Sequence, residues 1–376
     1  MTKKQQTYII KQEIWRKRKM KFVHIADMHF DTPFRLLSDR AELGEIRRLE
    51  QRKAFRKIIE YIKQNEIPYL FIAGDLYEHE YIRESTIRYI NNLFQEIPDT
   101  KIYITPGNHD PYIKNSYYET FSWSENVKIF TEKIEKVENK EFNLYGYGFE
   151  DFYFRGGRIE EINLEDKEKL NILLTHANLD GSDKTERDYN NISSKSLKEI
   201  GFDYIALGHI HKRNIEQNTN MIYPGSTISL GFDELGKHGM IVGNIEKGNL
   251  EIEFIHLDEK ELVELELDIS EITTIEELLE KIEELSINEN KLYKVILIGK
   301  RNFEINVYKL IKMIDRKEII KIKDKTILGY DIEKIAQETT TLRGIYVKEI
   351  LNKINKEPEN KEMLEKALEI GLEVLS

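Results

Sequence analysis

Side chains that can bind metal ions recur at five places in the chain, each at the end of a short apolar run. These places read Asp27-Met28-His29, Gly74-Asp75, Gly107-Asn108-His109-Asp110, Thr175-His176 and Gly208-His209-Ile210-His211. They hold five of the nine histidines of the chain. Carboxylate, imidazole and amide groups form a mixed oxygen and nitrogen donor set, which suits Mn²⁺, Fe²⁺ or Zn²⁺ better than Mg²⁺ alone. The residue types therefore indicate a metal site.

The candidate ligands are numerous enough for two ions that share one carboxylate. They are Asp27, His29, Asp75, Asn108, His176, His209 and His211. Two metal ions about 3.5–4 Å apart can activate water and stabilise both the attacking and the leaving oxygen of a displacement at phosphorus. Gly74, Gly107 and Gly208 directly precede ligands, where the chain must turn sharply. The expected chemistry is hydrolysis of a phosphate ester.

Buried strands must bring these groups together. Mostly apolar runs rich in Ile, Leu, Phe, Tyr or Val predict strands at 21–27, 68–75, 101–106, 171–176 and 203–209. Apolar residues at helical spacing predict helices over 50–64 and 84–97. Alternating strands and helices predict a largely parallel central sheet, with an antiparallel end after Asn214. Because ligands bind at the carboxyl ends of such strands, we expect the five places to meet in one cleft.

The composition is that of a globular chain without disulfides. The 376 residues predict two or three domains, and 57 basic against 68 acidic residues give a net charge of −11. The absence of cysteine excludes disulfides, thiolate zinc sites and a cysteine nucleophile, and it suits a cytoplasmic location. No run approaches the ~20 apolar residues of a membrane span, and the mean hydropathy is −0.54. We therefore expect no membrane partner.

Changes in residue composition and apolar spacing along the chain predict four parts. They are a basic N-terminal extension at 1–19, a large domain with the metal site at 20–258, a small αβ domain at 259–330 and a helical tail at 331–376. Within the tail, Gly344 predicts an interruption of the helix and Glu357-Pro358 predicts a break.

The ordered set DxH, GD, GNHD, H and GHxH, which runs from Asp27 to His211, resembles the pattern of the calcineurin-like metallophosphoesterases. The stretches HIADMHFDTPFRLL, GDLY and YPGSTISLGFDELGKHGMIV further resemble the bacterial SbcD-type repair nucleases and their YhaO-like branch. The resemblance implies an α/β fold, in which a central β-sheet sandwich flanked by helices forms four αββα layers. A small α+β capping domain and a helical C-terminal tail would follow.

The resemblance also implies an activity and partners. The expected activity is that of a metal-dependent DNA exonuclease acting at double-strand breaks by a two-metal mechanism. Two divalent ions, with Mn²⁺ favoured, would be the cofactors. The partners would be DNA ends and an SMC-like ATPase subunit that docks on the tail. The resemblance also implies that the chain forms a homodimer.

The resemblance assigns roles to single residues. One ion would be held by Asp27, His29, Asp75 and His211, and the other by Asp75, Asn108, His176 and His209. His109 would protonate the leaving oxygen, and Asp110 would orient its imidazole. Relatives often have histidine three residues after the second-block aspartate, where this chain has Glu78, followed by His79. Whether His79 contacts the substrate stays open.

Two other functions stay open beside the nuclease. A phosphomonoesterase, or a phosphodiesterase for small molecules such as cyclic nucleotides, would need the same ligands. A scaffold that only docks the ATPase would need the tail alone, and the ligand set argues against it. The stretch Gly231–His238 nearly matches a phosphate-binding loop, but it lacks the Ser or Thr for Mg²⁺ and carries two acids, so we reject it. His238 has no supporting context.

The net charge conflicts with DNA binding, because phosphate neutralisation supplies most of the non-specific affinity. Basic stretches at 11–21 and 47–57, together with Lys212-Arg213, predict a local basic rim. We therefore expect the chain alone to bind DNA weakly, and the ATPase partner to supply the missing affinity.

Overall fold

The structure is a computed structural model that describes residues 19–34, 43–153, 159–181, 189–215, 219–329, 332–338 and 340–375. The chain divides into two compact units, Met1–Leu262 and Val263–Ser376. The predicted basic extension lies outside the described residues except for Lys19. The separate capping domain and tail stay predictions. Among the described residues, no helix is long and apolar enough to cross a membrane.

The larger sheet of the first unit has six strands in the order β13-β12-β1-β2-β3-β4. Their bounds are Met20–Ile25 for β1, Tyr69–Ala73 for β2, Lys101–Thr105 for β3, Val127–Ile129 for β4, Gly239–Glu246 for β12 and Asn249–His256 for β13. The strands β1 to β4 are parallel, whereas β12 pairs antiparallel with both β1 and β13. This arrangement confirms the predicted parallel sheet with an antiparallel end.

A second sheet has five strands in the order β11-β10-β7-β6-β5. Their bounds are Glu135–Glu138 for β5, Phe142–Tyr147 for β6, Leu170–His176 for β7, Tyr204–Gly208 for β10 and Met221–Ile222 for β11. All its pairs are parallel except the one between β5 and β6. The short strands β8 (Asn178–Leu179) and β9 (Asn191–Ile192) pair separately. The apolar runs alone predicted a single central sheet, so the division into two is a difference from that expectation.

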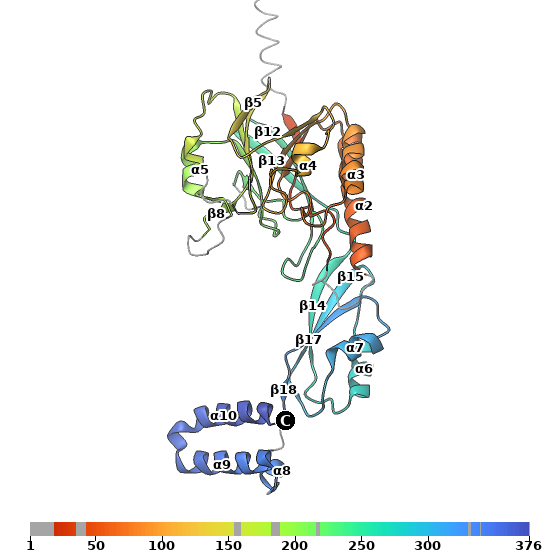
Figure 1. The fold of residues 1–376 in the computed structure, drawn as a ribbon, viewed down its shortest axis with the longest axis vertical. Coiled ribbons are helices and arrows are strands. Elements are labelled where there is room, and N and C mark those ends of the chain that lie inside the picture. The colour runs from red at the N-terminus through yellow and green to blue at the C-terminus, as the bar shows by residue number, and fades with distance from the viewer. Residues whose placement is uncertain are drawn as a thin grey trace, which may run out of the picture. The chain divides into compact units, whose positions relative to one another are not determined.

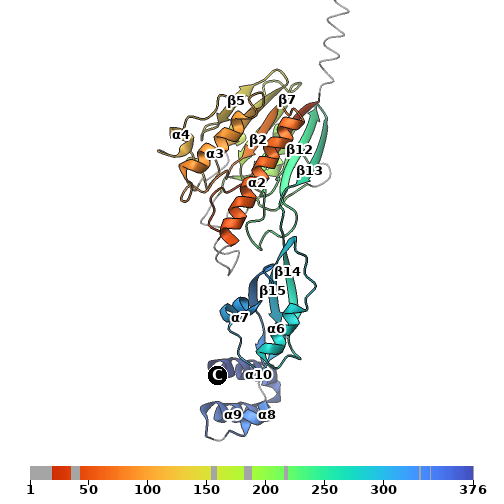
Figure 2. The same cartoon turned by 90° about the vertical axis from the view of Figure 1, so that its right-hand side faces the viewer.

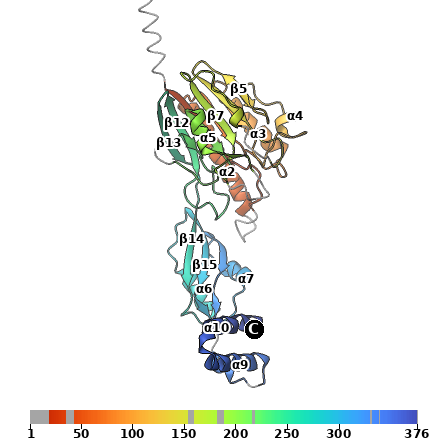
Figure 3. The same ribbon diagram turned by 90° about the vertical axis from the view of Figure 1, so that its left-hand side faces the viewer.

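The two sheets form the inner layers of a sandwich, and helices cover its outer faces (Figure 1). The inner faces meet in a buried core that includes Phe22, Phe71, Leu174 and Tyr204. Helices α2 (Leu43–Gln64) and α3 (Glu84–Gln95) cover the six-stranded sheet (Figure 2). Helix α5 (Ser194–Ile200) covers the five-stranded sheet (Figure 3). The αββα arrangement implied by the resemblance is therefore confirmed. Among the described residues of this unit, the other short helices are α4 (Tyr117–Thr120) and η1 (Ile159–Glu161).

Helix α2 begins seven residues before the predicted start at 50, because after Leu43 its first turns bury polar side chains, which apolar spacing does not reveal. Arg47 is fully buried and donates to both carboxylate oxygens of Asp258, each at 3.0 Å. It also donates to Glu50 at 2.7 Å and to the carbonyl of Ser229 at 2.7 Å. Apolar periodicity cannot detect a helix face that is packed through an ion cluster.

The Arg47 cluster should be necessary for stability. We expect Arg47→Met to lower the free energy of unfolding of the first unit by about 3–5 kcal/mol, because Glu50 and Asp258 would stay buried without their cation. Urea denaturation followed by tryptophan fluorescence measures this, since Trp123 lies in this unit. The control Arg56→Met removes an exposed arginine of the same helix, 3.5 Å from Glu96. Equal losses in both variants would contradict the prediction.

The second unit begins with a three-stranded sheet in the order β14-β15-β17. These strands are Glu261–Asp268, Lys291–Ile298 and Ile319–Asp324, and β15 and β17 are parallel. Helices α6 (Ile275–Glu283) and α7 (Val307–Met313) contribute Leu278, Ile282, Leu310 and Ile311 to its core. The two-residue strands β16 (Lys300–Arg301) and β18 (Ile327–Leu328) pair with each other.

The chain ends in helices, as predicted. They are α8 (Ile332–Ala336), α9 (Leu342–Lys356), the short η2 (Pro358–Asn360) and α10 (Lys361–Val374). The break at Glu357-Pro358 is confirmed, but the interruption at Gly344 is wrong. Gly344 lies in the first turn of α9, and its N–H is capped by the Thr341 hydroxyl at 3.0 Å. Helices α9 and α10 pack through Val347, Leu368 and Leu372.

Candidate metal centre

The five predicted places meet at one site at the carboxyl ends of β1, β2, β3, β7 and β10. Three of these strands belong to the six-stranded sheet and two to the other. The loops continue to pair beyond the strands, since the His29 N–H donates to the carbonyl of Asp75 at 2.9 Å. From α2, the Gln51 amide donates to the carbonyl of His29 at 3.0 Å. The expected convergence is thus observed, across two sheets rather than one.

The backbone at the strand ends is held in conformations that side chains rarely adopt. The φ angles of Asp27, His29, Asp75 and His209 are 52°, 48°, 52° and 100°. Such left-handed conformations persist where the surroundings enforce them, and they cluster at functional sites. A Cβ atom at Gly107 would collide with the Asp75 carboxylate, which explains the need for glycine there.

Asp27, His29 and His211 form a first group that could hold a metal ion. One ligand atom from each lies within 4.8 Å of the other two. The Nε2 atoms of His29 and His211 are 3.1 Å apart. Two nitrogens that each lie about 2.1 Å from one ion, at an angle between octahedral and tetrahedral, would be roughly 3.0–3.4 Å apart. The spacing therefore fits two ligands of the same ion.

A second group lies next to the first and shares residues with it. Asp27, Asp75 and His176 also offer ligand atoms within 4.8 Å of one another. The Oδ2 atom of Asp75 is 3.4 Å from His176 Nε2 and 3.6 Å from His29 Nε2, so it lies between the two groups. The Oδ1 atom of Asn108 is 3.0 Å from His176 Nε2 and 3.2 Å from His209 Nδ1. All seven predicted ligands therefore lie in one site.

Burial and mutual charge set the protonation of this site. Burial opposes ionisation of Asp75, but His176 and His29 outweigh it and hold the pKa of this carboxyl well below its usual range. Burial likewise opposes protonation of His176, yet the charge of Asp75 raises its pKa to about 9. Burial, and then the nearby His176, lower the pKa of His209 to about 3. Metal binding here would release the proton of His176.

His109 differs from the candidate ligands because its side chain is 44% exposed, whereas His29 and Asp75 are buried. It lies near them, as one ligand atom from each of the three falls within 4.8 Å of the others. Burial opposes protonation of His109, but the hydrogen bond to Glu78 and the charge of Asp75 raise its pKa to about 9. An exposed imidazole that keeps its proton can donate it to a bound substrate.

Glu78 holds two histidines at once, which the sequence did not predict. Its Oε1 is 2.7 Å from His29 Nδ1, and its Oε2 is 2.9 Å from His109 Nδ1. Burial raises the pKa of Glu78, but the hydrogen bonds from His109 and His29 outweigh it and lower the pKa to about 2. An ionised carboxylate only accepts hydrogen bonds, so it fixes the proton of His29 on Nδ1 and leaves the Nε2 lone pair for a metal ion.

The predicted role of Asp110 is wrong. Its carboxylate is buried and accepts from the N–H groups of Asp75, Leu76 and Gly107 and from the Tyr118 hydroxyl, at 3.0, 2.7, 2.6 and 2.6 Å. The turn that carries His109 outward directs the neighbouring Asp110 side chain inward, where it braces the strand ends. Glu78 orients the His109 imidazole instead. His79 packs edge-on against Phe152, with ring centres 5.7 Å apart.

The rejected stretch Gly231–His238 supplies a second carboxylate that the sequence did not reveal. Glu234 is buried, and its Oε2 lies 3.0 Å from His211 Nδ1 and 2.9 Å from the Ser226 hydroxyl. His238 lies behind it, with Nε2 2.6 Å from the Glu234 carbonyl and Nδ1 2.8 Å from the Ser226 hydroxyl. Glu234, one of the two acids that argued against a phosphate-binding loop, thus orients the candidate ligand His211.

Removing this support should weaken metal binding. We expect Glu234→Gln to lower the affinity of the first group for Mn²⁺ by about 10–100-fold, because the tautomer of His211 would no longer be fixed. Calorimetric titration of the metal-free chain with Mn²⁺ measures the affinity. Asp233→Asn is the matched control, since this neighbouring acid is exposed. If both variants bind Mn²⁺ like the unaltered chain, Glu234 has no role in orienting His211.

Comparison with known proteins gives one family. A family model described as calcineurin-like phosphoesterase matches residues 20–213. The chain is 25% identical over 276 residues to a protein named uncharacterized metallophosphoesterase YhaO from Bacillus subtilis (strain 168), covering 70% of this chain and 66% of that protein. It is 26% identical over 268 residues to the D subunit of the nuclease SbcCD from Staphylococcus epidermidis, covering 61% of this chain and 67% of that protein.

The chain thus spans about two thirds of the length of these two relatives. Among solved structures, the crystal structure of TT1561 of Thermus thermophilus matches with a TM-score of 0.37 at 10% identity, covering 63% of this chain and 99% of that chain.

Proposed function

The chain belongs to the calcineurin-like phosphoesterase family, and on this premise we propose that it is a metal-dependent DNA exonuclease that processes DNA ends. Family membership makes it a hydrolase of phosphate esters that uses divalent metal ions. The observation that supports this proposal most strongly is the convergence of seven candidate ligands next to one exposed histidine. The similarity to a protein named as the D subunit of a nuclease, SbcCD, favours DNA as the substrate.

Two divalent ions, with Mn²⁺ favoured, would occupy the two groups. The first ion would take Asp27, His29, Asp75 and His211, and the second would take Asp75, Asn108, His176 and His209. When bound, the ions would supply an activated water and stabilise charge on the phosphate oxygens. The donor set fits this assignment, because imidazole and carboxylate together suit Mn²⁺ better than an all-oxygen site would.

His109 would act as the general acid. Its Nδ1 is hydrogen-bonded to Glu78, so Nε2 carries the proton that can be transferred. As the bond between phosphorus and the sugar oxygen breaks, this proton would pass to the departing oxygen. Glu78 would keep the imidazole oriented and charged until that moment. Asp75 contributes to the same placement, since its Oδ1 accepts from the His109 N–H at 2.8 Å.

The basic rim predicted for 47–57 is smaller than the sequence suggests. Arg47 is buried, and Lys57 is paired with Glu259 at 2.9 Å. The predicted stretch 11–21 lies mostly outside the described residues. This charge distribution and the net charge of −11 are consistent with weak DNA binding by the chain alone. An SMC-like ATPase partner in the cytoplasm would supply the missing affinity.

The ATPase would dock on the C-terminal helices. Helix α9 presents Leu342 and Ile345, whose exposed fractions are 68% and 54%. We expect Leu342→Glu combined with Ile345→Glu to reduce co-purification of the ATPase subunit at least about tenfold, because such a patch of apolar side chains commonly marks an interface. Lys348→Glu, an exposed change on the same helix, is the control. Undiminished co-purification would remove this face from the interface.

A comparison of three substrates tests the proposed activity. The purified chain with Mn²⁺ is given p-nitrophenyl phosphate, bis(p-nitrophenyl) phosphate and linear DNA. A nuclease should hydrolyse the bis-ester and DNA and act poorly on the monoester. A preference for the monoester, or for a cyclic nucleotide, would contradict the proposal and favour the small-molecule phosphoesterase instead.

A further inference from the structure

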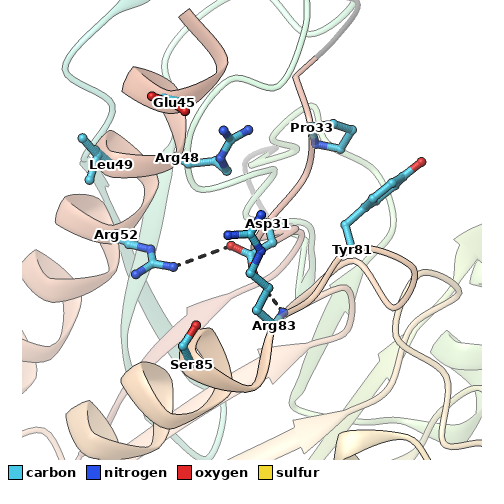
Figure 4. Close-up of a pocket in the computed structure, with 9 residues that line it drawn as sticks. All are labelled: Asp31, Pro33, Glu45, Arg48, Leu49, Arg52, Tyr81, Arg83 and Ser85. Carbon is cyan, nitrogen blue, oxygen red and sulfur yellow. Dashed lines mark hydrogen bonds and ion pairs between the residues drawn. The ribbon is translucent and has the colours of Figure 1, made fainter. Parts of the chain in front are cut away.

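A cavity of about 520 Å³ opens beside the loops that carry the metal centre. One wall is the start of α2, and the others are the segment after β1 and the loop that leads into α3 (Figure 4). Asp31, which lines it, follows the candidate ligand His29 by two residues, and Tyr81 and Arg83 follow Glu78 by three and five. Two residues span at most about 7 Å, so the backbone of Asp31 in this wall lies within that distance of the backbone of His29.

Three arginines line this cavity, and one of them is paired with an acid of its wall. Arg52 lies 3.6 Å from Asp31 and donates to the Thr86 hydroxyl at 2.8 Å. The same Asp31 carboxylate accepts from the Thr86 hydroxyl at 2.7 Å and from the Arg83 backbone N–H at 3.1 Å. Asp31 is therefore engaged by hydrogen bonds within the wall, and its charge is met by Arg52.

Arg48 and Arg83 are the two remaining guanidinium groups. Within the described part of the chain, no carboxylate forms an ion pair with either of them, although the exposed Glu45 also lines the cavity. Both line the cavity, Arg48 from α2 and Arg83 from the loop that leads into α3, and the ring of Tyr81 is drawn on the side away from α2 (Figure 4). An arginine that is free of acids presents a fork of N–H donors that matches a phosphate group.

We propose that this cavity, which we call the arginine pocket, binds a backbone phosphate of a nucleic-acid strand within a few nucleotides of the one that is cleaved. Arg48 and Arg83 would hold that phosphate, and Tyr81, whose side chain is 42% exposed, would stack on a neighbouring base. The proposal rests on the proposed nuclease function. A monoester has no second phosphate to place there, so the pocket selects for a polynucleotide.

A binding experiment without catalysis tests the pocket. The full chain is titrated in EDTA against a fluorescent single-stranded oligonucleotide, at several salt concentrations, and anisotropy is read. The test variant is Arg48→Gln with Arg83→Gln. The control is Arg56→Gln with Arg88→Gln, which removes the same charge from exposed arginines that pair with Glu96 and Glu84 and do not line the cavity.

We expect the test variant to bind about tenfold more weakly, and the slope of log affinity against log salt to shrink by about 0.7 for the phosphate contact that is lost. The control should stay within about twofold of the unaltered chain. With Mn²⁺, the ratio of DNA cleavage to bis(p-nitrophenyl) phosphate hydrolysis should fall in the test variant alone.

Other results would contradict the proposed function of the arginine pocket. They are equal binding by both variants, no binding by the unaltered chain, or binding of inorganic phosphate as tight as that of the oligonucleotide with the same dependence on Arg48 and Arg83. The last result would assign the pocket to a small anion. A chain that binds the oligonucleotide through these arginines yet cleaves no DNA would instead contradict the nuclease function and leave the pocket intact.

Discussion

Replacing Asp75 by alanine will abolish metal binding and hydrolysis together. The Oδ2 atom of Asp75 lies between His29 and His176, at 3.6 and 3.4 Å, and is thus the carboxylate that the proposed assignment gives to both ions. Its low pKa keeps it ionised at neutral pH. Without it, the second ion would have no carboxylate ligand and the first would have only Asp27, which leaves too little negative charge to hold divalent ions against water.

Metal content after dialysis, measured by mass spectrometry, and turnover of the bis-ester give the two results. We expect about two equivalents of Mn²⁺ in the unaltered chain and less than one in the variant, with turnover at background. Asp151→Ala, an exposed aspartate, serves as the control. A variant that loses activity but keeps both equivalents would contradict the shared role of Asp75.

His109→Ala will reduce the rate by about 10²–10⁴-fold and leave metal content and DNA binding unchanged. The side chain is exposed and hydrogen-bonded to Glu78 alone among the described side chains, so its removal breaks no side-chain hydrogen bond to a candidate ligand and removes only the edge-on contact with the His29 ring, whose centre is 4.7 Å away. The loss should be larger for a poor leaving group such as a sugar than for p-nitrophenolate, because the poorer leaving group needs the proton more.

Single-turnover cleavage of DNA and steady-state hydrolysis of the bis-ester measure this difference. His256→Ala, which changes a histidine outside the ligand groups, should behave like the unaltered chain. Full turnover of DNA by His109→Ala would show that another group supplies the proton.

The sequence predicted well those parts of the site that depend on local pattern. Strands buried on both faces require continuous apolar runs, and a metal site at their carboxyl ends requires His and Asp directly after them, so both signals coincide at Asp27 and His176. The start of α2 was missed because Arg47 and Glu50 pack as an ion cluster, which breaks the apolar period. Likewise, nothing in an apolar run tells which of two packed sheets it joins.

Supporting residues could not be predicted because their partners are distant in sequence. Glu78 was noticed as a departure from the pattern of relatives, but its contact with His29 spans 49 residues. Glu234 reaches His211 from a loop that precedes another strand, and no spacing rule marks it. Asp110 was misassigned because adjacency to His109 suggests contact, whereas neighbouring side chains in a tight turn point apart.

The central claim is that this site cleaves DNA from its ends. The most direct test is incubation of the purified chain with end-labelled linear duplex DNA, in Mn²⁺ or in EDTA, with His109→Ala as the control. The account predicts stepwise shortening that needs Mn²⁺ and that the His109 variant loses. Intact DNA, in the presence of a chain that carries two metal equivalents and hydrolyses the bis-ester, would contradict it.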